Sequence, residues 1–199
     1  MATPDSTLSK QKVSRRNRTI FDKQGNVYFI TTTVIDFLKI FSINDNYALI
    51  LLDSLKHQIK EHRATLLAYV IMPNHLHLVI YIPKGESISD FMRDFKKYTS
   101  TKIRQQLERD KYNKLVETLR ITSNGRKPRV FHLWMDRFDD LIITTVKTLG
   151  IKINYVHNNP VKAGLVEKCE DWKFSSARNY FSDDQSLIYV STNWEVEEM

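Results

Sequence analysis

Apolar residues recur at two different spacings along the first part of the chain. The run Val27 to Asp36 is rich in β-branched and aromatic residues and favours a strand. Asn44 is a suitable helix N-cap, and apolar residues follow it near the helical repeat up to about Arg63. These positions, Tyr47, Leu51, Leu55 and Ile59, predict an amphipathic helix.

A hairpin and a second helix come next. The strand-like runs 65–71 and 75–82 are separated only by Met72, Pro73 and Asn74, which favour a turn. Ser87 or Ser89 can then cap a helix whose apolar face consists of Ile88, Phe91, Met92, Phe95, Ile103 and Leu107. A further strand is expected within 130–143, after an exposed connection over 113–128.

This order predicts an α+β fold of the ferredoxin-like βαββαβ type, an antiparallel sheet with helices packed on one face. A C-terminal helical extension begins at about residue 144, with a helix over 145–157 that ends at Asn158-Asn159-Pro160. We expect one domain over 21–182, a basic, flexible arm over 1–20 and a tail over 183–199.

The charge balance favours a polyanionic partner. Lys and Arg outnumber Asp and Glu by 30 to 23, which gives a net charge of +7. Basic residues over 10–18 are equally compatible with a phosphate-binding arm and a solvated tail. The single Cys169 excludes an internal disulfide, and neither a secretory signal nor a membrane span is evident, so we expect a cytoplasmic protein.

His75 and His77 are the sharpest candidates for chemistry. Side chains alternate faces along a strand, so both imidazoles emerge on one face while Leu76 and Leu78 face the other. Two such rings can converge on one metal ion. The pattern is equally compatible with two structural histidines that hydrogen-bond within the fold.

The second candidate is Tyr98, on the helix that follows the hairpin. It lies seven residues beyond Phe91 and three beyond Phe95, which predicts that it faces the sheet. Taken alone, such a tyrosine is more often a core residue with its hydroxyl at the rim. Arg93, Lys96 and Lys97 give the same helix a cationic flank that could neutralise a phosphodiester.

Several stretches, in this order, resemble the REP-associated tyrosine transposases, a branch of the single-tyrosine HUH transposases. Met72 to His77 is similar to the HUH element, Asp94 to Ser100 to the tyrosine helix, and Leu133 to Asp140 to a Trp-containing segment. Asn154 to Val166, Glu170 to Trp172 and Ser175 to Tyr180 resemble the C-terminal signature. The resemblance runs from about Val27 to Tyr180 and implies a ferredoxin-like fold.

The resemblance implies a metal-dependent enzyme that cuts single-stranded DNA. Tyr98 would attack a phosphodiester, leaving a 5′-phosphotyrosine link and a free 3′-hydroxyl, so that the strand can be rejoined. His75 and His77 would hold a divalent metal, Mg²⁺ or Mn²⁺ in this family, although paired imidazoles alone also suit zinc or nickel. The DNA partner would carry imperfect-palindrome hairpins, and the protein would be a monomer or a homodimer.

One residue departs from the family pattern. Relatives commonly have Asn or Gln one helical turn after the tyrosine as a further metal ligand, and Lys102 stands there, which cannot bind a cation when protonated. Asp94 or Gln105 could replace that ligand, or Lys102 could contact the phosphate together with Arg93 and Lys97.

Two other functions remain open. The chain could be a catalytically relict ferredoxin-like protein that only binds hairpin nucleic acid. A nucleotide hydrolase of the His-x-His-x-His type would need a third histidine where Val79 stands. We expect no metal role for His132 or His157, a structural role for His157 to Pro160, and core positions for Trp134 and Trp172.

Overall fold

The computed structural model describes residues 25–121 and 130–193. Its main sheet has the strand order β2-β3-β1-β6. The strands are β1 (Asn26–Thr33), β2 (Thr65–Met72), β3 (His75–Ile82) and β6 (Asp139–Ile143). Strand β3 lies between β1 and β2 and is antiparallel to both, and β6 pairs antiparallel with the outer side of β1. This is the ferredoxin-like arrangement, so the predicted fold class is confirmed.

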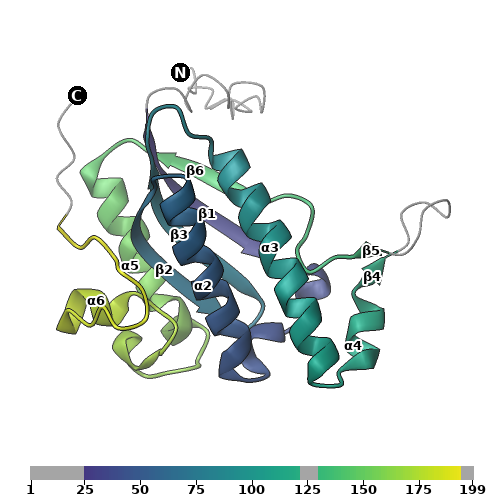
Figure 1. The fold of residues 1–199 in the computed structure, drawn as a ribbon. Helices are drawn as coiled ribbons and strands as arrows, with labels where there is room; N and C mark the ends of the chain where they lie inside the picture. Colours follow the sequence, from purple (N-terminus) through teal and green to yellow (C-terminus); the bar gives the residue numbers. More distant parts are fainter. Residues whose placement is uncertain (1–24, 122–129, 194–199) are drawn as a thin grey trace, which may run out of the picture.

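Two long helices cover one face of the sheet. Helix α2 (Asp45–Glu61) and helix α3 (Ile88–Arg109) lie side by side in front of the strands (Figure 1). Both begin at predicted caps, because Asn44 Oδ1 accepts from Asn46 N at 3.0 Å and Ser87 Oγ accepts from Ser89 N at 3.2 Å. Their apolar sides pack on one set of alternating strand residues, which includes Leu76, Leu78, Ile80 and Ile82 of β3.

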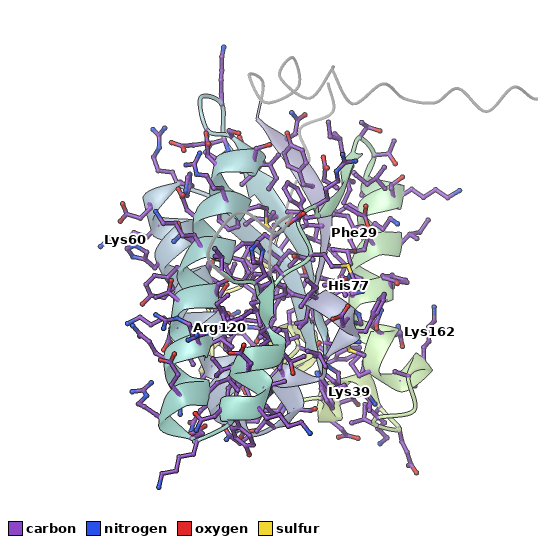
Figure 2. The ribbon with its side chains drawn as sticks, turned by 90° about the vertical axis from the view of Figure 1, so that its right-hand side faces the viewer. Phe29, Lys39, Lys60, His77, Arg120 and Lys162 are labelled. Atoms are coloured by element: carbon purple, nitrogen blue, oxygen red, sulfur yellow. The ribbon has the colours of Figure 1, made fainter. Side chains whose placement is uncertain are left out.

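Helix α5 (Val146–Lys162) covers the opposite face of the sheet and packs on β2 and β3. Figure 2 shows the sheet between the α2/α3 pair on one side and α5 on the other. Leu149, Ile153 and Val156 of α5 form a second core with Val79 of β3. The helices of the βαββαβ unit therefore lie on one face, as predicted, while the C-terminal extension supplies the other layer.

The helix break predicted at Asn158-Asn159-Pro160 is wrong. Helix α5 continues through Pro160 to Lys162, although Pro160 cannot donate a backbone hydrogen bond. Burial explains this, because Val156, His157 and Pro160 are all buried beneath the C-terminal extension or against the sheet. The chain turns at Gly164 instead, whose φ of 68° is readily adopted by glycine.

Short elements complete the fold. Between β1 and α2 the chain forms η2 (Ile35–Phe37) and η3 (Ile40–Ser42). Between α3 and β6 it forms α4 (Asn113–Thr118), β4 (Arg120–Ile121) and β5 (Val130–Phe131). The last two are η4 (Cys169–Asp171) and α6 (Ala177–Ser182). The connection predicted over 113–128 thus begins with α4 and β4, and its remainder lies outside the described residues.

The C-terminal segment closes the outer edge of β2. Ile71 N donates to Phe174 O at 2.9 Å, and Ser191 N donates to Leu66 O at 2.9 Å. Covering an edge strand in this way satisfies backbone groups that would otherwise be exposed. The predicted tail therefore begins too early at 183, because the chain still packs on the domain at Ser191. The predicted arm over 1–20 lies outside the described residues.

A buried serine joins this segment to both β2 and α5. Ser176 Oγ accepts a hydrogen bond from Tyr69 N at 2.9 Å and lies 2.8 Å from His157 Nε2. All of these groups are shielded from water, so each depends on the serine for a partner. The contact fixes α5 on the sheet.

None of the described helices has a stretch long and apolar enough to cross a membrane.

We predict that Ser176→Ala lowers the free energy of unfolding by about 1–3 kcal/mol, because it leaves the buried Tyr69 N–H and His157 imidazole without a partner. Urea unfolding measures the change. Ser186→Ala, on the exposed surface, is the control and should change stability by less than about 0.5 kcal/mol. Equal effects of the two substitutions would contradict the structural role of Ser176.

Candidate active site

The two histidines of β3 lie on the face of the sheet that α5 covers. His75 is opposite Thr33 and His77 is opposite Thr31 on β1, so both imidazoles share the strand face of Val79. The ring centroids are 4.8 Å apart, close enough for both rings to bind one ion. The predicted pairing of His75 and His77 is therefore present in the structure.

Each imidazole is oriented by a hydrogen bond at Nδ1. His77 Nδ1 lies 2.8 Å from Thr31 Oγ1, and His75 Nδ1 lies 2.7 Å from Asn74 Oδ1. The Asn74 amide is itself fixed, since its Nδ2 donates to Phe37 O at 3.1 Å. His75 must therefore carry its proton on Nδ1, which leaves the Nε2 lone pair for a ligand. Such outer hydrogen bonds are typical of metal-binding histidines.

Burial keeps both histidines in the neutral form that binds metal. It lowers the pKa of His75 below its usual range. It also lowers the pKa of His77, to about 3, with further contributions from the nearby His75 and Lys152. Both rings are therefore uncharged at neutral pH, when their nitrogen lone pairs are available.

Tyr155 of α5 lies against this pair. Its ring centroid is 5.3 Å from that of His77, in an edge-to-face arrangement. Phe29 of β1 stacks on the other side of His77 at 5.5 Å and also touches Tyr155 at 5.7 Å. Tyr155 remains 38% exposed, so a partly solvent-accessible tyrosine adjoins His77.

Two lysines flank this tyrosine. Lys152 Nζ lies 4.5 Å from the centre of the Phe29 ring and 5.8 Å from that of Tyr155. Lys162 Nζ lies 5.5 Å from the Tyr155 ring. Figure 2 shows Lys162 on α5, with Phe29 and His77 on the neighbouring sheet. The phenol thus lies between cations that attract a phosphate group.

Tyr98 lies elsewhere, and the prediction that it faces the sheet is wrong. Its ring is 40% exposed and contacts His57 of α2, with 6.2 Å between ring centroids. Because α2 and α3 cover the face opposite α5, the sheet separates Tyr98 from His75 and His77. The structure does not bring Tyr98 and the two histidines into one pocket.

Thr99, and not Tyr98, takes the core position on α3. It is fully buried, and its Oγ1 accepts a hydrogen bond from Trp134 Nε1 at 2.9 Å. Trp134 is buried as predicted, and Trp172 is partly buried against the second core. The adjacent residue Tyr98 is consequently turned about 100° away, toward solvent.

The cationic candidates of α3 also lie away from the histidines. Arg93 is paired with Asp90 and Asp94, which offset its charge. Lys102 Nζ lies 5.5 Å from the Tyr98 ring, and Lys97 lines an open groove of about 330 Å³ beside Trp134. These three residues stay candidates for DNA contact, on a different face from the histidine pair.

The donor set at the histidines fits a divalent cation that also binds a substrate. Among the described residues, no cluster of three or more His, Cys, Asp or Glu residues could enclose an ion. Two imidazoles leave coordination positions open, which is typical of a catalytic metal and not of a structural one. Asp94 and Gln105, the substitute ligands considered from the sequence, belong to α3 on the other face.

Helix α5 also carries an amide that is a candidate donor. Asn159 follows Tyr155 by four residues, so the two side chains share a face of the helix. The resemblance led us to expect an amide one helical turn after the tyrosine. Asn159 stands at that position relative to Tyr155, whereas Lys102 stands there relative to Tyr98. Residue spacing alone could have singled out Tyr155 and Asn159 as candidates, because they stand within the predicted C-terminal signature.

The comparisons with known proteins define the family. Residues 39–159 match the family described as "Transposase IS200 like", and this stretch includes both histidines, Tyr98 and Tyr155. The chain belongs to this family of DNA-cleaving transposases, which are generally metal-dependent. The resemblance recognised in the sequence is confirmed.

Individual relatives agree with this assignment. A protein of Haemophilus influenzae, named as a candidate REP-associated tyrosine transposase, is 28% identical over 166 residues, 83% of this chain and 86% of the relative. A REP-associated tyrosine transposase of Escherichia coli is 27% identical over 110 residues, 55% of this chain and 52% of the relative.

A solved structure shares the fold. It is a REP-associated tyrosine transposase bound to a REP hairpin, with a TM-score of 0.61 and 20% sequence identity. The similarity covers 88% of this chain and 90% of the solved one.

The buried histidines predict a stability that falls in acid. The unfolded chain binds protons on histidine near pH 6.5, whereas His77 in the fold does so near pH 3 and His157 near pH 4. Between these values the unfolded state holds more protons, so the free energy of unfolding decreases as the pH falls from 6.5. Each histidine contributes at most about 1.4 kcal/mol per pH unit.

Urea unfolding at about pH 7 and about pH 5, with a chelator present, measures this dependence. We expect a lower stability at the acidic pH and a shallower dependence in His77→Asn. A stability that is the same or higher at the acidic pH would show that these imidazoles are not held neutral.

Proposed function

We propose that this protein cleaves and rejoins single-stranded DNA with Tyr155 as the nucleophile and His75 and His77 as metal ligands. The observation that carries the proposal is the contact between Tyr155 and His77, whose ring centroids are 5.3 Å apart on the α5 face of the sheet. A nucleophile must lie where the activated phosphate is held, and Tyr155 meets that condition. Tyr98, on the other face, does not.

In the proposed reaction the Tyr155 oxygen attacks the scissile phosphorus. A bond forms between the phenolic oxygen and phosphorus, and the bond between phosphorus and the 3′-oxygen breaks. The phenol loses its proton, and the leaving 3′-oxygen gains one to become a hydroxyl. The product is a 5′-phosphotyrosine, which conserves the phosphoester for rejoining without a high-energy cofactor.

The proposed metal site combines residues of β3 and α5. His75, His77 and Asn159 would hold Mg²⁺ or Mn²⁺, which when bound polarises and orients the phosphate. Thr31 and Asn74 fix the two imidazoles through their Nδ1 atoms. Their proposed role is to hold the two imidazoles in the orientation that leaves Nε2 for the metal.

Lys152 and Lys162 would bind the DNA backbone beside the reacting phosphate. Both ammonium groups lie within 6 Å of the Tyr155 ring centre. Because a phosphodiester carries one negative charge, cations on either side of the phenol favour its approach. They would also stabilise the charge that develops on the phosphate oxygens during attack.

The proposed substrate is single-stranded DNA that carries imperfect-palindrome hairpins, acted on in the cytoplasm. The support is the solved relative of the same fold, which is bound to a REP hairpin, together with the net charge of +7. The alternative of a catalytically relict binder was motivated by Lys102. That reason no longer applies, because Asn159 has the expected spacing from Tyr155.

We predict that Tyr155→Phe abolishes the covalent adduct between the protein and a hairpin oligonucleotide in Mn²⁺. The loss should exceed about 1,000-fold, since no oxygen remains to attack phosphorus. Tyr98→Phe is the matched control, because Tyr98 is equally exposed, and it should change adduct formation by no more than about twofold. Denaturing gel electrophoresis measures the adduct. An adduct that persists in Tyr155→Phe and is lost in Tyr98→Phe would refute the proposal.

We further predict that Asn159→Ala raises the Mn²⁺ concentration for half-maximal adduct formation by about tenfold or more, because a ligand is lost. The neighbouring Asn158 provides the control, since its amide donates to Asn154 O along the helix surface. Asn158→Ala should leave the Mn²⁺ dependence unchanged. If both variants behave alike, Asn159 is not a ligand.

A further inference from the structure

An exposed phenylalanine follows β1, and its backbone is hydrogen-bonded to the turn that precedes His75. Phe37 belongs to η2 and is 63% exposed. The residues around it are not exposed in this way, because Ile35 and Leu38 are partly buried against the main core. The short element therefore directs two apolar side chains inward and holds the largest one in solvent.

The backbone of Phe37 has an unfavourable conformation. Asp36 and Phe37 have φ values of 51° and 54°, in the left-handed region that residues with a Cβ rarely adopt. Two consecutive residues of this kind persist only when neighbouring contacts enforce them, and such strain is common at ligand-binding sites. The strain here is maintained by hydrogen bonds to the turn that precedes His75.

Those hydrogen bonds connect Phe37 to a proposed metal ligand. Phe37 O accepts from Asn74 Nδ2 at 3.1 Å, and Asn74 Oδ1 accepts from His75 Nδ1 at 2.7 Å. Val34 N also donates to Asn74 O at 2.8 Å. The Phe37 backbone carbonyl and the His75 imidazole are thus held by the same asparagine, on adjacent strand ends.

We propose that Phe37 stacks on an unpaired base of the DNA strand, at a nucleotide close to the scissile phosphate. The inference rests on the proposed function, and the match to the transposase family begins only at residue 39, after Phe37. Base stacking on an exposed aromatic ring is a general way to hold single strands, because every base has a π face.

The surroundings favour a nucleotide as the occupant. Lys39 follows two residues later and is exposed, which places a cation for the backbone near a ring for the base. In the view of Figure 2, Lys39 lies at the same end of the sheet, below His77. A strand whose phosphate reaches His75 would pass this end of the sheet.

The test compares two hairpin oligonucleotides, one with a short single-stranded flank and one without, in the presence of a chelator. We expect Phe37→Ala to weaken binding of the flanked hairpin by about tenfold and to leave binding of the blunt hairpin unchanged. Phe37→Trp should bind the flanked hairpin as tightly as the wild type does. Phe181→Ala is the control, since Phe181 is 67% exposed on α6, away from η2.

A fluorescent base analogue, 2-aminopurine, placed at each flank position in turn identifies the stacked base. Wild-type protein should quench it at one position, and Phe37→Ala should not. Unchanged affinity of Phe37→Ala for the flanked hairpin, or an equal loss on both hairpins, would overturn the proposal. Equal affinity of the wild-type protein for the flanked and the blunt hairpin would also overturn it.

The readout is binding without cleavage, so it is independent of the Tyr155 assignment. A failure of the proposed function would appear as a missing Tyr155-dependent adduct, with stacking by Phe37 still measurable. A failure of the Phe37 inference would leave that adduct intact. Thermal unfolding of Phe37→Ala, expected to match that of Phe181→Ala, excludes a folding defect as the cause.

Discussion

The two-residue period of strand β3 determines where chemistry can occur in this protein. Leu76, Leu78 and Ile80 must face the core beneath α2 and α3, which commits His75 and His77 to the opposite face. A shift of one residue would bury two imidazoles among aliphatic side chains and expose the leucines. The partner of the histidines must therefore come from the element that covers the second face, which is α5.

Helix α5 is held in position by contacts far along the chain. His157, two residues after Tyr155, lies 2.8 Å from Ser176 of the C-terminal extension, and that serine binds the backbone of Tyr69 on β2. The extension thus serves the site by fixing the helix that carries the phenol. It also explains why a helix with an internal proline does not break there, since its buried face is packed on both the sheet and the extension.

Local pattern was sufficient to predict the sheet, both long helices of its first layer and the histidine pair. Alternation along β3 and the caps at Asn44 and Ser87 are short-range signals. The orientation of Tyr98 could not be predicted from local pattern, because its spacing from Phe91 and Phe95 places it at the border of the buried side of α3. The pairing of Thr99 with Trp134, 35 residues away, decides which residue turns inward.

The candidate residues of α5 were missed for a related reason. A run ending in Asn158-Asn159-Pro160 has the local signature of a helix end. A helix that ended before this run would not include Asn159. Only tertiary packing carries the helix through Pro160 and aligns Asn159 with Tyr155. The four-residue spacing of Tyr155 and Asn159 was present in the sequence all the same, whereas the position four residues after Tyr98 is Lys102.

Identifying the residue that becomes linked to DNA decides between Tyr155 and Tyr98 as the nucleophile. Trypsin digestion of the adduct, followed by mass spectrometry, separates the two tyrosines, because Tyr155 falls in the peptide Ile153 to Lys162 and Tyr98 in the peptide Tyr98 to Lys102. We predict the nucleotide on the peptide that contains Tyr155. A nucleotide on the peptide that contains Tyr98 would contradict the proposal that Tyr155 is the nucleophile.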